Sequence, residues 1–231
     1  MLASRLLALP VQTAEMDPRA ADEPLYPGEE AAVAGAIQKR RREYIAGRVC
    51  ARRAMVALGE RPAPVFQCAD RAPIWPEGLV GSITHTDTWC AAAVARTADG
   101  VRALGLDIEP AEPIEPDLLR VICLPEERDY LAGRPAEQRG LLGRAIFSAK
   151  ECAYKCQYAV SRTPLDFHAI RIYLDPPRGD FLAVFQRDAG PFSSGHGLRG
   201  HLLMENGYVM TAMALTACGT GATFPGERFA G

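Results

Sequence analysis

The sequence predicts an α+β (α/β) protein built from two similar subdomains in a pseudo-two-fold repeat, each a helix packed on a small antiparallel sheet. Two observations support this prediction. A long stretch with helical spacing is followed by short apolar runs of β character, and the same order begins again after a linker stiffened by Pro110, Pro113 and Pro116. The repeat concerns the order of elements, because the two halves share no repeated sequence.

The first half is expected to contain four strands and a long helix. Residues 4–13 are predicted as a strand and 28–58 as a helical region that ends at Gly59. Proline and turn-forming residues predict a loop over 60–78. Three apolar runs separated by short polar turns then predict an antiparallel meander: 79–84, 89–95 and 101–108.

The second half is expected to contain helices at 117–132, broken at Pro125, and at 136–160. Strand-like runs follow at 168–174, 181–186, 199–205 and 208–216. The last two flank Asn206-Gly207, a dipeptide that favours a type I′ hairpin turn. We expect subdomains at 1–108 and 109–231, with a loose glycine-rich segment after Cys218.

Composition excludes several classes of protein. The net charge of −2 over 231 residues argues against a nucleic-acid binder. No apolar run approaches the ~20 residues of a membrane helix, and the N-terminal segment lacks a signal-peptide cleavage pattern. The seven scattered cysteines lack the spacing of a zinc site, so we interpret them as reduced thiols of a cytoplasmic protein.

Two carboxylates end the run Gly105-Leu-Asp107-Ile-Glu109. Residues two apart on a strand project from one face, about 7 Å apart. Two acids on a semi-buried face repel each other unless a cation or proton compensates them, and magnesium prefers such oxygen ligands. The alternative is that both acids cap the end of a strand near the linker.

A predicted helix carries the run Phe147-Ser-Ala-Lys150-Glu151-x-x-x-Lys155. Glu151 and Lys155 share a helix face, which is typical of an ordinary surface salt bridge. Their neighbours are mostly apolar, however, and charges in a poorly solvated helix need ligands or partners.

Two further segments suit a phosphate. The predicted strand Gly81-Ser82-Ile-Thr84-His85 carries two hydroxyl groups and ends with an imidazole at a turn, where these groups could bind a phosphate. A histidine at the end of a strand also fits a structural role. Seven basic residues fall within 39–53, and arginine binds phosphomonoesters bidentately. A solvated charged face is the alternative. One helical stripe is expected to hold Arg41, Arg48 and Arg52, with Arg40 beside it.

Taken together, these motifs resemble those of the 4′-phosphopantetheinyl transferases, the monomeric type that serves peptide and polyketide synthases and siderophore assembly. Further similarity lies between Arg41 and Arg52 and in Pro73-Ile-Trp-Pro76, which looks most like the enterobactin-synthase branch. The resemblance covers about 5–175. It implies a pseudo-dimer that binds coenzyme A between its halves and transfers the phosphopantetheine arm to a serine of an apo acyl or peptidyl carrier protein, leaving 3′,5′-ADP.

The resemblance also implies roles for individual residues. Mg²⁺, or Mn²⁺ in its place, would be held by Asp107, Glu109 and Glu151. Lys150 and Lys155 would approach the phosphates, and Glu151 would be the base that accepts the serine proton, with Lys155 at the leaving phosphate. The remaining coenzyme A contacts would come from Arg40, Arg48, Arg71, Ser82, Thr84 and His85.

Alternative functions use the same residues. A magnesium-dependent nucleotide or coenzyme A pyrophosphatase would direct water, not serine, at the phosphorus. A non-catalytic module for adenine nucleotides would have no need of three carboxylates. The region 117–135 is a hypothetical docking surface for the carrier protein, and an amphipathic packing helix explains it equally well.

Overall fold

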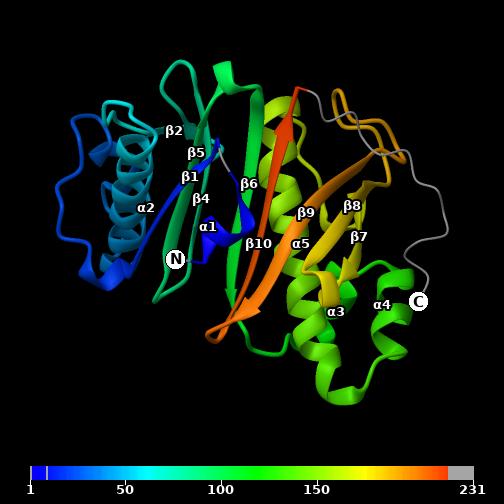
Figure 1. Cartoon of the computed structure of the whole chain (residues 1–231). Helices are drawn as coiled ribbons and strands as arrows, with labels where there is room; N and C mark the ends of the chain where they lie inside the picture. Colours follow the sequence, from blue (N-terminus) through cyan, green and yellow to red (C-terminus); the bar gives the residue numbers. More distant parts are fainter. Residues whose placement is uncertain (1, 9, 218–231) are drawn as a thin grey trace.

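The computed structural model describes residues 2–8 and 10–217 and places two α+β halves side by side (Figure 1). In the first half a three-stranded antiparallel sheet has the order β1-β5-β4, and helix α2 lies against it. A two-stranded ribbon, β2 and β3, joins α2 to this sheet. The elements are α1 (Ala3–Leu6), β1 (Gln12–Met16), α2 (Gln38–Ala57), β2 (Phe66–Gln67), β3 (Pro73–Ile74), β4 (Leu79–His85) and β5 (Cys90–Arg96).

The second half is a five-stranded antiparallel sheet of order β6-β10-β9-β8-β7, covered by the long helix α5. Both residues of the expected turn have positive φ, 54° at Asn206 and 80° at Gly207, which confirms the type I′ hairpin between β9 and β10. The elements are β6 (Val101–Pro110), α3 (Pro116–Ile122), α4 (Pro125–Ala132), α5 (Ala136–Ser161), β7 (Ile170–Asp175), β8 (Asp180–Phe185), β9 (Gly197–Glu205) and β10 (Tyr208–Thr216). The expected fold class is therefore confirmed.

Two predictions about the first half were wrong. Residues 4–13 are not one strand: α1 ends at Leu6, and β1 begins only at Gln12. The buried residues Ala3, Leu6 and Leu7 have helical spacing and pack into the core that lies between the halves. The expected meander also fails at its third strand, because β1 pairs with the free edge of β5 and β6 pairs with β10 instead.

The pairing of β6 bears on the boundary between the halves. A division at 108/109 would cut β6 two residues before its end at Pro110, although this strand belongs to the second sheet. We therefore propose that the halves divide in the turn at 97–100.

Side chains join the two sheets along a seam between β4 and β6. The amide of Leu106 donates to Oγ of Ser82, and that of Ile108 donates to Oγ1 of Thr84, both at 3.1 Å. The two strands therefore run in the same direction, and hydroxyl groups stand where a backbone ladder would otherwise supply acceptors.

The helix α5 lies close against β6. A Cβ added to Gly105 would stand 2.2 Å from the carbonyl oxygen of Cys152, so only glycine fits there. This close approach brings the polar face of α5 to the carboxylates of β6. None of the helices within residues 2–8 and 10–217 is long and apolar enough to cross a membrane.

Candidate active site

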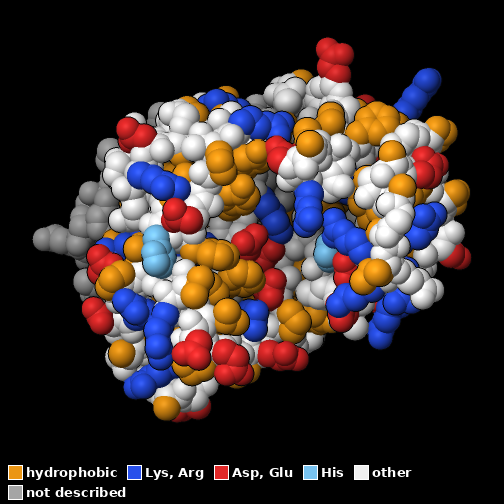
Figure 2. Space-filling view, turned by 180° about the vertical axis from the view of Figure 1, so that it is seen from behind, with side chains coloured by type: hydrophobic (Ala, Val, Ile, Leu, Met, Phe, Trp, Pro, Cys, Tyr) orange, Lys and Arg blue, Asp and Glu red, His pale blue; other side chains and the backbone are white. Residues whose placement is uncertain are grey.

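A cavity of about 500 Å³ lies between the two halves, with α2, β4 and the β2–β3 loop on one side and α5 on the other. From behind, the molecule shows a central hollow where basic and acidic side chains face one another (Figure 2). The acidic lining residues are Glu43, Asp70 and Glu151. The basic lining residues are Arg40, Arg48, Arg71, His85, Arg102, Lys155 and Arg162. Positive charge dominates this wall, although the whole chain is slightly acidic.

His85 ends β4 beside the first turn of α2. Nη1 of Arg40 lies 3.1 Å from its Nε2, and Oε2 of Glu43 lies 3.8 Å from its Nδ1. Burial lowers the pKa of His85, while Glu43 opposes that shift. Arg40 and His85 thus form one basic corner of the cavity.

Arg48 is buried about two turns beyond Arg40 on α2. Its Nε donates to the carbonyl of Val65 at 2.9 Å, and its guanidinium lies 3.8 Å from the ring centroid of Tyr44. Burial lowers the pKa of Arg48. This anchoring holds one charge at the cavity wall with little freedom to move.

The expected arginine stripe has divided roles. Arg52 is buried in an ion pair with Glu29, at 2.9 Å, and does not line the cavity. Arg41 is exposed. Neither a uniform solvated face nor a uniform phosphate-binding stripe describes α2.

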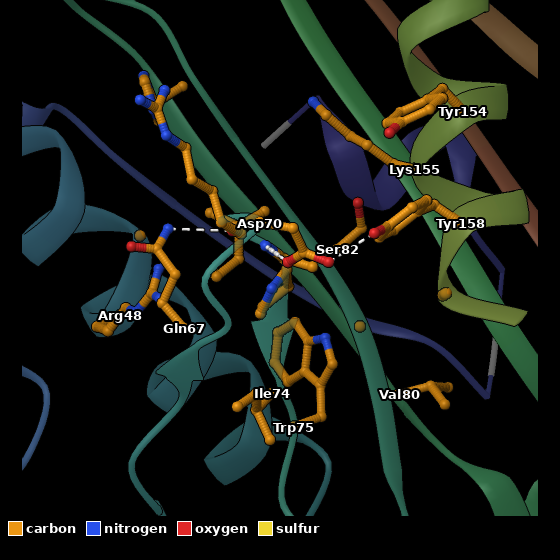
Figure 3. Close-up of a pocket in the computed structure, with 18 of the residues that line it drawn as sticks. Arg48, Gln67, Asp70, Ile74, Trp75, Val80, Ser82, Tyr154, Lys155 and Tyr158 are labelled. Atoms are coloured by element: carbon orange, nitrogen blue, oxygen red, sulfur yellow. Dashed lines mark hydrogen bonds between the residues drawn. The ribbon is translucent and has the colours of Figure 1, made fainter. Parts of the chain in front are cut away.

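The loop between β2 and β3 forms part of the cavity wall, where Asp70 lies (Figure 3). Arg71 has the left-handed φ of 72° and lines the cavity. The hydroxyl of Tyr158 on α5 donates to Oδ2 of the neighbouring Asp70 at 2.5 Å, so this loop bridges the two halves. Arg71 was expected from the sequence, but Asp70 and Tyr158 were not, because an aspartate in a proline-rich loop gives no local signal that it faces a helix 88 residues away.

Arg102, Arg162, Trp75 and Tyr154 also line the cavity and were missed. Arg102 is the one exposed residue of β6, and Arg162 is the left-handed C-cap of α5. The sequence predicted the apolar run at 101–108 as a strand, but not the element that this strand faces.

Asp107 is buried beside α5. Its Oδ1 accepts a hydrogen bond from Nζ of Lys155 at 2.7 Å and another from Oγ1 of Thr84 at 3.3 Å. Its other oxygen, Oδ2, is buried without a hydrogen-bond partner. The pKa of Lys155 is raised, because the charge and hydrogen bond of Asp107 outweigh the effect of burial. A buried carboxylate oxygen without a donor is an open position for a cation.

Glu109 and Glu151 flank this pair. Burial, together with the charge of Asp107, raises the pKa of Glu109 to about 7. Burial also raises the pKa of Glu151, which Lys155 opposes. Oε2 of Glu109 lies 3.2 Å from Nη1 of Arg144. Over residues 2–8 and 10–217, no three acidic, histidine or cysteine side chains are grouped closely enough to form a ready metal site.

Lys155 forms its ion pair with Asp107 of β6, not with Glu151 on its own helix. Lys155 reaches β6, where it bonds to the carbonyl of Leu106 as well as to Asp107. The side chain of Glu151 lines the main cavity and a second one of about 180 Å³. The prediction that these charges need partners in an apolar helix is confirmed for Lys155.

Lys150 does not approach the main cavity, contrary to the sequence-based expectation. Its Nζ lies 2.7 Å from Oε2 of Glu127 and donates to the carbonyls of Ile122 and Phe167. It lies about 100° around the helix from Glu151, which turns it towards α3 and α4. Its buried ammonium therefore has three protein acceptors.

Of the two hydroxyl residues of β4, Ser82 lines the cavity and Thr84 does not. Ser82 lines the cavity but accepts from the Leu106 amide, and Thr84 is buried between β6 and Asp107. They hold the seam together. The site thus combines a basic cavity with an acid-lysine cluster at one wall, an arrangement suited to a ligand with several phosphates.

Comparison with known proteins gives concordant matches. Residues 28–95 match the 4′-phosphopantetheinyl transferase N-terminal domain, and residues 103–212 match the 4′-phosphopantetheinyl transferase superfamily. The chain is 40% identical over 197 residues to 4′-phosphopantetheinyl transferase Svp of Streptomyces mobaraensis, covering 84% of this chain and 79% of that protein.

Two further relatives bear on the branch. 4′-Phosphopantetheinyl transferase Npt of Nocardia iowensis is 33% identical over 222 residues, covering 90% of this chain and 97% of its own length. Enterobactin synthase component D of Salmonella typhimurium is 35% identical over 125 residues, covering 51% of this chain and 48% of its own length. The likeness to the enterobactin-synthase branch therefore extends over about half of the chain.

Proposed function

Because this chain belongs to the 4′-phosphopantetheinyl transferase family, we propose that it transfers the phosphopantetheine arm of coenzyme A to a serine hydroxyl of an apo acyl or peptidyl carrier protein. The other product is 3′,5′-ADP. The observation that carries this proposal is the basic cavity between the halves, which ends at the cluster of Asp107, Glu151 and Lys155.

The adenosine end of coenzyme A belongs at the α2 side of the cavity. Arg40, Arg48 and His85 converge there, and a 3′-phosphate would accept hydrogen bonds from their N–H groups. Arg71 lies on the β2–β3 loop and also lines the cavity. Trp75 directly follows β3 and lines the cavity (Figure 3), where a base would fit against its indole ring.

The carboxylates fit a divalent cation. The Oδ2 of Asp107 is unpartnered, and burial, with the charge of Asp107, raises the pKa of both Glu109 and Glu151, so a cation among these acids would be stabilising. Mg²⁺, or Mn²⁺, would be held by Asp107 and Glu151, and by Glu109 once it leaves Arg144. When bound, the ion would neutralise charge on the pyrophosphate oxygens.

The protein's own groups supply proton transfer and charge. The pKa of Glu151 is raised by burial, which makes its carboxylate a better acceptor for the serine proton. Lys155 is held cationic beside Asp107 and would stabilise the leaving phosphate of 3′,5′-ADP. The incoming nucleophile comes from the carrier protein, whose serine must reach the side of the cavity that Glu151 lines.

Intact-mass spectrometry tests this function. A small apo carrier domain incubated with the protein, coenzyme A and Mg²⁺ should gain about 340 Da, and the gain should vanish with EDTA or in Asp107→Ala. Hydrolysis of coenzyme A without any gain across fatty-acid, polyketide and peptide carriers would favour a pyrophosphatase. If the carrier gains no mass and coenzyme A is not hydrolysed, both reactions are contradicted.

A further inference from the structure

Two lysines of α5, five residues apart, have different surroundings. Lys155 lines the main cavity, whereas Lys150 is turned into the second half and is almost completely buried. We propose that Lys150 and Glu127 form a buried positioning pair, which fixes the α3–α4 segment and the start of β7 against α5 beside Glu151. The expected effect on catalysis rests on the proposed transfer, whereas the contacts of the pair do not.

All three N–H bonds of the Lys150 ammonium have protein acceptors. Nζ lies 2.7 Å from Oε2 of Glu127, 2.8 Å from the carbonyl of Ile122 and 2.7 Å from that of Phe167. An ammonium has three donors and no more. Lys150 would have to abandon a buried partner before it could bind a phosphate, and such an exchange is unfavourable.

Glu127 is equally committed. Its Oε1 accepts from the amide of Ile172 and its Oε2 from the amide of Leu124, both at 2.7 Å. The second bond is half of a capping box at the start of α4. The carboxylate therefore joins the α4 N-terminus to β7, and Lys150 joins both to α5.

This junction has a direct connection to the reaction centre. Residue 150 precedes Glu151, and Phe167, whose carbonyl accepts from Lys150, lines the second cavity together with Glu151. That cavity has a volume of about 180 Å³ and is also lined by Lys150, Tyr154, Leu165, Asp166 and Ile170. The pair thus holds part of the wall of this second cavity and so constrains the space beside Glu151.

The experiment compares Lys150→Met, Glu127→Gln and the double variant with Lys155→Met, the matched lysine change on the same helix. Calorimetric titration with coenzyme A measures phosphate binding. Hydrogen exchange of the Leu124 and Ile172 amides measures the junction directly. Steady-state kinetics with a carrier domain measures kcat and KM.

We expect Lys150→Met to keep the Kd for coenzyme A within about twofold, while kcat/KM for the carrier falls at least about tenfold. Lys155→Met should weaken coenzyme A binding about tenfold or more. The Leu124 and Ile172 amides should lose protection in Lys150→Met. The double variant should recover part of that protection, because it removes the negative charge of Glu127, which the single change leaves buried without a countercharge.

Coenzyme A binding that weakens as much in Lys150→Met as in Lys155→Met would overturn the proposal, and so would unchanged protection at both amides. If Lys150→Met does not fold, the double variant and Glu127→Gln supply the same comparison. If the wild-type protein fails to modify a carrier, the transfer reaction is refuted, but the titration and exchange measurements still decide the role of Lys150.

Discussion

Gly105→Ala tests the close contact on which the site depends. The added methyl group would stand 2.2 Å from the carbonyl oxygen of Cys152 and 3.0 Å from both its carbonyl carbon and its Sγ. The nearest atom belongs to the α5 backbone, so no flexible side chain can turn aside to make room. The helix must move away from β6, and Lys155 moves with it.

The expected cost lies at the upper end for an overpacked core, about 3 kcal/mol in the free energy of unfolding. For a chain of this length that lowers Tm by roughly 6–12 °C. Urea unfolding with a check that the m-value is unchanged gives the free energy, and thermal unfolding gives Tm. Transfer activity should fall at temperatures where the variant remains folded, because the distance from Lys155 to Asp107 increases.

Gly133→Ala is the matched control. Gly133 has an ordinary φ of −74°, and its added Cβ would meet nothing nearer than 3.6 Å. Its free energy of unfolding should stay within about 0.5 kcal/mol of the wild-type value. Equal stability of the two alanine variants would refute the reasoning about how α5 packs on β6.

Three further predictions concern the seam, His85 and the loop. Thr84→Val should cost about 1–3 kcal/mol in the free energy of unfolding, because the buried Ile108 amide loses its acceptor. Thr84→Ser keeps the acceptor, and equal urea midpoints for the two variants would contradict this prediction. Burial lowers the pKa of His85 in the folded protein below the ordinary value of 6.5. The neutral imidazole therefore contributes its full stability above pH 6.5, and this contribution is lost as the pH falls through the pKa of the folded state. His85→Gln should flatten that part of the stability profile, and coincident profiles would exclude the effect. Tyr158→Phe removes the bond to Asp70 and should speed coenzyme A dissociation about two- to tenfold in stopped-flow, whereas an unchanged rate would mean that the loop does not retain the ligand.

Local patterns predicted most of the second half because its elements are long and their signals lie within the segment. The break at Pro125 and the turn at Asn206-Gly207 depend on backbone preferences that neighbours do not alter. In the first half, the spacing of Ala3, Leu6 and Leu7 was helical, but a single turn is too short to distinguish from a strand by pattern. The partner of β6 lies about a hundred residues away, so the run at 101–108 looked the same as the third strand of a meander.

In the site, too, the sequence predicted which charged residues need partners but not which partners they have. The apolar surroundings of Lys150 and Lys155 predicted that both need partners, and both have them. Which partner each finds depends on the direction of its side chain from α5, and that is decided by tertiary packing. Motif position therefore brought Lys155 to the cavity correctly but misplaced Lys150, whose partner Glu127 carries no distinguishing sequence signal.

The seam between β4 and β6 has a further consequence for the chain as a folding unit. Each of these strands is the outermost strand of its own sheet, and each faces the other. A free edge strand with buried residues such as Leu106 and Ile108 is a template for aggregation. By meeting along the seam, the two halves protect each other's edge. If the chain were cut in the turn at 97–100, each fragment should aggregate when made alone and stay dispersed when the two are made together.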